Sequence, residues 1–187
     1  IDRVIALQRG DGSFGFWSPW DYGGQWISAF VTDFLVRAAE EGFEVPQAPR
    51  ERAIGWLRDS VRSGDVADEA LAGYAYAHYL LAAAEAGELS RLRHFADVYG
   101  EALDSPMDMA MVSAALARYG DVERAGQAFR TALELEPDPK SWANYGSPLR
   151  DRAASVALLA EVATGLARLM PEAREVAAAA ATDPHLS

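Results

Sequence analysis

An apolar stripe with helical spacing begins just after Trp26 and ends at Gly42. Its members recur every three or four positions: Ile27, Phe30, Val31, Phe34, Leu35 and Ala38. This spacing predicts a helix that stops at the glycine. A narrower stripe, Ile54, Leu57 and Val61, lies among charged residues after two prolines, and predicts an amphipathic helix.

Other segments are apolar on nearly every side. They are residues 70–86, 107–120 and most of 149–170. A helix with this composition is surrounded by neighbours. Amphipathic segments lie between them, including residues 121–137. The connections are short and rich in Gly, Pro, Asp and Ser, and no strand-like alternation is found. The chain is therefore predicted to be all-α, either a solenoid of stacked hairpins or an α/α toroid with inner and outer rings of helices.

The stretch LQRGDGSFGFWSPWDYGGQWISAF, residues 7–30, combines glycines with an unusual number of large rings. Asp11-Gly12 predicts a tight turn. Exposed rings leave apolar surface in water, so we expect the rings to pack between the helix before the loop and the helix after it. Residues 8–17 resemble the Gln-and-Gly-aromatic loop that recurs in α/α toroids of the terpenoid-cyclase and protein-prenyltransferase type.

Composition limits the classes of function. The 187 residues, half of them hydrophobic, suffice for one core, so residues 1–187 are predicted to form a single helical domain. A formal net charge of -11 would repel a phosphate backbone, which argues against a nucleic-acid partner. The sequence has no cysteine, which excludes disulfides, thiol catalysis and cysteine-ligated metals. No apolar run approaches the roughly 20 residues of a membrane span.

Candidate catalytic chemistry is sparse. No Asp-x-Asp-Asp or Asp-Asp-x-x-Asp motif is present, which argues against cyclase chemistry. No pair of carboxylates stands out for sugar hydrolysis. His78, His94 and His185 lack the spacing of metal ligands, and His78 is predicted to be a hydrogen-bonded core residue. We expect no enzyme activity, no cofactor and no metal site.

Residues 113–137 follow the tetratricopeptide pattern, with Gly120, Ala125, Phe129, Ala132 and Pro137 in the expected places. A repeat array needs about three such units, and only a weak echo is found about 34 residues away. We interpret the match as convergent packing of one helix hairpin. A tetratricopeptide-like protein-binding scaffold is the alternative function.

A longer match favours another family. The sequence DGSFGFW, followed by QWISAFVTDFLVRAAEEGFEVP, resembles the thioester domain of the alpha-2-macroglobulin and complement family, in its bacterial branch. A second stretch, WANYGSPLRDRAASVALLAEV at residues 142–162, resembles a later inner helix of that branch. The resemblance implies an α/α toroid. The predicted helices are too few to close such a double ring, so we expect it to be incomplete at its N-terminal side.

The resemblance also implies a function. Bacterial members of this family are large, broad-spectrum protease traps of the periplasm, often attached to the inner membrane by a lipid. A protease cuts a bait segment, the molecule rearranges, and a thioester becomes exposed to a lysine of the attacker. The expected partners are proteases, reached through the full-length protein, and other domains of the same polypeptide, with no direct membrane insertion by this part.

The thioester itself forms between Cys and Gln in a Cys-x-Glu-Gln motif, and this sequence has no Cys. Either the motif precedes Ile1, or the protein is one of the bacterial members without a thioester; the sequence leaves both open.

By analogy with the family, the rings that lead into the first inner helix are the candidates to surround the thioester. A dry pocket for a reactive acyl group needs apolar walls. The candidates are Phe16, Trp17, Trp20, Tyr22 and Trp26. Residues 145–150 would enter a later inner helix from the same end, but Ser147 and Pro148 are predicted to act as simple helix-capping residues.

Overall fold

The computed structural model describes residues 1–62, 66–67, 70–135 and 147–162. The regular elements of these residues are helices. One isolated antiparallel bridge pairs Gln8 with Phe14. The all-α prediction is therefore confirmed. The chain forms two compact units, the first comprising residues 1–87 and the second beginning at Glu88. The single domain and the closed-ring arrangement of a toroid stay predictions.

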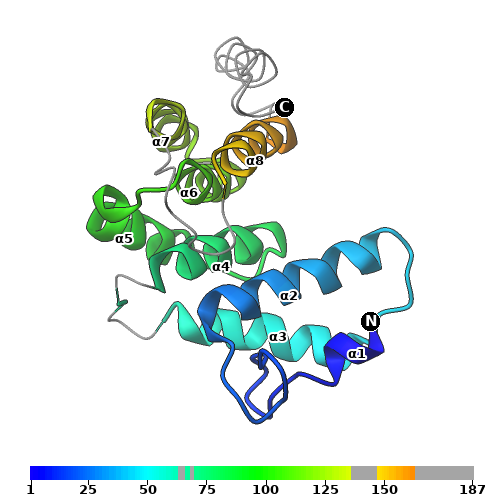
Figure 1. The fold of residues 1–187 in the computed structure, drawn as a ribbon. Helices are drawn as coiled ribbons and strands as arrows, with labels where there is room; N and C mark the ends of the chain where they lie inside the picture. Colours follow the sequence, from blue (N-terminus) through cyan, green and yellow to red (C-terminus); the bar gives the residue numbers. More distant parts are fainter. Residues whose placement is uncertain (63–65, 68–69, 136–146, 163–187) are drawn as a thin grey trace. The chain divides into compact units, whose positions relative to one another are not determined.

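Among its described residues, the first unit contains the α-helices α1 (Asp2–Ile5), α2 (Gly24–Glu40), α3 (Gln47–Ser60) and α4 (Leu71–Ala83). In Figure 1, α2 lies against both α3 and α4. The bounds of α2 match the prediction, because the chain turns at Gly42 with a positive φ of 84°. A small core forms where the opening loop meets these helices, from Phe14, Leu35 and Ala53.

The buried face of α2 is not its most hydrophobic stripe. The buried residues are Gln25, Ser28, Ala29, Thr32 and Leu35. Phe30 and Phe34, which belong to the predicted stripe, are exposed. Small side chains let α4 approach closely here: a Cβ added at Gly73 would lie 2.6 Å from the backbone nitrogen of Trp26. Close backbone packing thus determines which face of α2 is covered.

Polar contacts complete the junction of α2 and α4. The Tyr76 phenol donates a hydrogen bond of 2.6 Å to Asp33 Oδ2, and Arg37 Nε lies 2.8 Å from Asp33 Oδ1. Burial and the neighbouring carboxylate raise the pKa of the Tyr76 phenol, so the hydroxyl stays a donor. Burial also lowers the pKa of His78 to about 4, which keeps this α4 imidazole neutral and agrees with a core role.

The second unit contains α5 (Leu89–Tyr99), the short 3-10 helix η2 (Gly100–Ala102), α6 (Pro106–Arg118), α7 (Val122–Glu134) and α8 (Pro148–Glu161). Helix α6 packs against α5, α7 and α8, and every residue from Pro106 to Leu116 is buried. Since residues 71, 73 and 75–82 of α4 are buried as well, two of the three segments predicted to be surrounded by neighbours are confirmed. The prediction is wrong for the described part of the third segment, because α8 buries only Asp151, Ser155, Leu158 and Leu159 and exposes Leu149.

The tetratricopeptide-like stretch forms one hairpin of α6 and α7. Ala125, Phe129 and Ala132 are buried on α7, and the Ser113 hydroxyl donates 2.5 Å to the carbonyl of Ala125. Small residues therefore lie where the helices touch, as interpreted from the sequence. Pro137, like Trp142 to Gly146, His185 and the segment after residue 162, lies outside the described residues.

Candidate functional site

The loop between α1 and α2 is closed at its base by a tight turn. Asp11 accepts from both the backbone N–H and the hydroxyl of Ser13, at 3.0 and 2.6 Å, and Gly12 has a φ of 98°. A Cβ at Gly12 would lie 2.5 Å from the carbonyl oxygen of Arg52. The predicted Asp11-Gly12 turn is confirmed, and it also fits the loop tightly against α3.

One ring of the loop packs as expected. Phe14 is completely buried in the core of the first unit, and its N–H donates 3.1 Å to the Ser28 hydroxyl on α2. Nearby, Gln8 Nε2 donates 2.8 Å to the carbonyl of Pro49, and Arg52 donates 2.7 Å to Gln8 Oε1. Phe14 and Gln8 therefore anchor the loop to α2 and α3.

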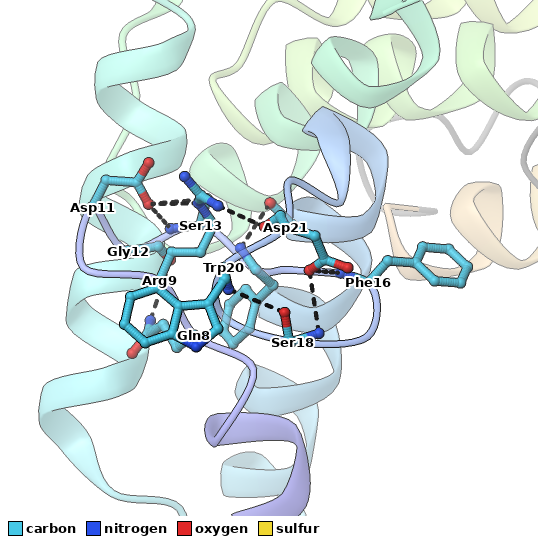
Figure 2. A network of polar contacts seen from close by, with 11 residues as sticks. Gln8, Arg9, Asp11, Gly12, Ser13, Phe16, Ser18, Trp20 and Asp21 are labelled. Carbon is cyan, nitrogen blue, oxygen red and sulfur yellow. Dashed lines mark hydrogen bonds and ion pairs between the residues drawn. The ribbon is translucent and has the colours of Figure 1, made fainter.

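A carboxylate holds the next part of the loop. Asp21 accepts from the N–H groups of Phe16, Trp17 and Ser18, at 3.1, 3.0 and 3.2 Å. These bonds, the one from Trp17 foremost, hold the pKa of Asp21 below its ordinary value. Figure 2 shows the side chain of Asp21 reaching back across the loop to these amides. The Asp21 carboxylate is thus the central acceptor of this hydrogen-bond network.

Two further contacts make this network rigid. Arg9 donates 2.6 Å to the carbonyl of Asp21, and the N–H of Trp20 donates 3.2 Å to the Ser18 hydroxyl. A Cβ at Gly15 would collide with the carbonyl oxygen of Ser18, so this position requires glycine. Sequence reasoning missed Asp21 and Arg9; the available signal was the cluster of turn formers at residues 18–24.

Four of the five candidate rings are exposed to solvent. Trp20 is 90% exposed, Trp17 82%, Tyr22 62% and Phe16 38%. The expectation that rings pack between the flanking helices is therefore wrong for these four. The physical reason is that hydrogen bonds of Gln8, Arg9 and Asp21, together with the buried Phe14, close and anchor the loop, so these four rings are not needed to hold it.

The structure brings only some of the candidates together. Phe16 and Trp17 meet edge to face at 4.8 Å, and the Arg9 guanidinium lies 5.9 Å from the ring centre of Tyr22. Trp26, half-buried at the start of α2, stacks on Phe30 at 5.2 Å with 8° between the planes. In Figure 2 the side chains of Phe16 and Trp20 point to opposite sides of the loop. Phe16 and Trp17 thus meet each other, whereas Trp26 packs against Phe30 of α2.

Apolar exposure continues beyond the loop, along α2. Phe30 and Phe34 are exposed on the helix, and Phe43 is 64% exposed just after it. Phe34 and Phe43 line a shallow depression at the C-terminal end of α2, together with Ile1, Ala38 and Pro46. The first unit therefore exposes large apolar side chains along α2 and just after it, as well as in the loop.

The described residues offer little else that resembles a catalytic or cofactor site. No group of three or more His, Cys, Asp or Glu side chains among them is placed to hold a metal ion. None of their helices is both long and apolar enough to span a membrane. Ser147 caps α8 through a 3.2 Å bond from the N–H of Arg150, with Pro148 as the first helical residue, which confirms the predicted capping.

Comparison with known proteins identifies relatives over most of the chain. The alpha-2-macroglobulin of Escherichia coli is 33% identical over 173 residues, which is 86% of this chain and 10% of the relative. The alpha-2-macroglobulin of Xylella fastidiosa is 28% identical over 187 residues, or 95% of this chain and 11% of the relative. The chain thus spans about a tenth of the length of these curated relatives. No model of a protein family matches it.

Solved structures agree. E. coli alpha-2-macroglobulin activated by porcine elastase has a TM-score of 0.81 at 27% identity, covering 94% of this chain and 16% of that one. The trypsin-activated E. coli protein has a TM-score of 0.78 at 28% identity, covering 92% and 13%. Salmonella alpha-2-macroglobulin reacted with methylamine has a TM-score of 0.78 at 28% identity, covering 92% and 12%.

Proposed function

Because the chain is homologous to a segment of the bacterial alpha-2-macroglobulins, we propose that it is part of a broad-spectrum bacterial protease trap. Within that trap it is the helical part that houses and shields a thioester. Its partners are proteases, met through the full-length protein, and the other domains of the same polypeptide. The trap acts in the periplasm as a defence against proteases and not as an enzyme.

One observation carries the shielding role: a rigid loop presents large rings to solvent. The network of Asp21, Arg9 and Ser18 fixes the loop, yet Trp17 and Trp20 contribute almost nothing to the core. Rings on a preorganised loop lose little conformational entropy when another surface covers them. They can therefore form an apolar wall that excludes water from a reactive acyl group.

The solved relatives support this chemistry through the reagents that act on them. The E. coli protein is activated by trypsin in one structure and by elastase in another, and the Salmonella protein is reacted with methylamine, a primary amine. A primary amine attacks a thioester carbonyl, so that a carbon–nitrogen bond forms, the carbon–sulfur bond breaks and the thiol leaves with a proton. Since this sequence has no cysteine, that thiol would belong to a part of the polypeptide outside these 187 residues.

Covalent capture tests the proposal. The full-length polypeptide that contains this chain is mixed with trypsin and run on a denaturing gel. We expect a covalent adduct that prior treatment with methylamine abolishes, while the 187-residue chain alone forms none and hydrolyses no polysaccharide. Absence of an adduct from the full-length protein, or an adduct with the isolated chain, would overturn the proposed thioester role.

A further inference from the structure

Two helices of the second unit begin with the same short sequence pattern. Both α6 and α8 start with Ser-Pro, at Ser105-Pro106 and Ser147-Pro148. Each then carries an Asp in its first turn, Asp108 as the third residue of α6 and Asp151 as the fourth of α8. The two helices pack against each other. Unlike most acidic residues in a first helical turn, both carboxyl groups are buried.

Asp151 has its partners. Arg150 contacts Asp151 Oδ1 through Nε at 2.8 Å and Nη2 at 2.7 Å. The hydroxyl of Ser105 points to Asp151 Oδ2 at 3.4 Å, a long contact that reaches from the start of α6 to α8. Because Ser105 turns toward Asp151, its side chain does not cap its own helix. Asp151 therefore joins the two helix starts through its carboxyl group.

Asp108 is left without an equivalent partner. Its residue is 6% exposed, and Asp108 Oδ1 is buried with no hydrogen-bond partner within the described part of the chain. The charges that act on it are Asp151 and Arg150 of α8 and Asp104 of the connection before α6. No charged side chain described on α5 or α7, which also pack on α6, acts on it.

The charge balance of this cluster is unfavourable when all groups are ionised. Three carboxyl groups face one guanidinium, and that guanidinium already pairs with Asp151. A second carboxylate beside it is disfavoured by burial and by like charge. A proton on Asp108 removes both penalties and supplies a hydrogen-bond donor.

We propose that Asp108 is a proton-operated switch at the junction of α6 and α8: its protonated form holds the two helix starts together, and its ionisation loosens them. This inference does not depend on the thioester function. It assigns to the second unit a proton-binding site that couples the order of two helix starts to pH in the neutral range.

The direction of the effect follows from the titration of this group. Burial first, and then the charge of Asp151, raise the pKa of Asp108 to about 7. An acid whose pKa is higher in the folded state than in the unfolded state stabilises the fold while it is protonated. That stabilisation is fully present below about pH 4, the ordinary value. It is lost as the pH rises through about 7.

Hydrogen exchange on the whole chain tests the switch. Peptides covering the first turns of α6 and α8 should exchange roughly tenfold faster at pH 8.5 than at pH 5.5, after correction for intrinsic rates. Asp108→Asn, which keeps the shape and cannot ionise, should abolish this extra pH dependence. Glu123→Gln, at an exposed acidic residue in the first turn of α7, is the matched control and should leave it unchanged.

A measurement on the unaltered chain makes the test independent of how the variants fold. The carbon chemical shift of the Asp108 carboxyl group should titrate with a midpoint near 7. A midpoint near 4, the ordinary value, would overturn the proposal. So would an Asp108→Asn variant that keeps the pH-dependent exchange of the unaltered chain.

Discussion

A single carboxylate can order a short segment of a loop without burying its rings, and Asp21 does so through three amides of residues 16–18. Pattern and composition identified the Asp11-Gly12 turn and the wealth of rings. They did not separate Phe14, which is buried, from Trp17 and Trp20, which are exposed. That distinction depends on where the backbone turns back at Gly15, a position fixed by contacts that the sequence does not display.

The difference between these rings can be measured as stability. Phe14→Ala should cost about 3–5 kcal/mol in the free energy of unfolding, as expected for a large buried ring. Trp17→Ala should change it by no more than about 0.5 kcal/mol, as at an exposed site. Denaturant unfolding with both variants measures the contrast. Equal losses would mean that Trp17 packs into the domain after all, contrary to the structure.

Helix positions were predictable, and the face that each helix buries was predictable only in part. Helices α4 and α6 are apolar all round and are buried as expected. Helix α2 instead buries Ser28, Ala29 and Thr32, because a close crossing with α4 favours small side chains over large ones. Hydrophobic periodicity finds the helix, but it carries no information about how near a neighbouring backbone comes.

The close crossing predicts opposite effects for two glycines in helices. Gly73→Ala should destabilise the first unit by about 1–3 kcal/mol, since the added methyl meets the backbone of Trp26 at 2.6 Å. Gly55→Ala, in α3, meets nothing closer than 4.0 Å and should stabilise it by up to about 1 kcal/mol through helix propensity. Thermal unfolding compares the two, and a neutral Gly73→Ala would contradict the close crossing.

At the scale of the whole molecule, two sequence motifs in the expected order predicted the family, and the relatives of the chain confirm it. Residue types and spacing do not reveal what covers the exposed rings of the first unit. In the proposed function, the covering surface belongs to parts of the polypeptide outside these 187 residues. In the proposed trap, these rings are therefore where this chain meets the other domains of the polypeptide.

The most direct test measures the lifetime of the thioester in the full-length protein. If Trp20 and Tyr22 help to keep the acyl group dry, Trp20→Ala and Tyr22→Ala should leave the melting temperature nearly unchanged but speed the spontaneous appearance of free thiol. Phe43→Ala removes another exposed ring of the first unit, outside the loop, and should release thiol at the unaltered rate. Unchanged thiol release in both loop variants would contradict the shielding role of the loop.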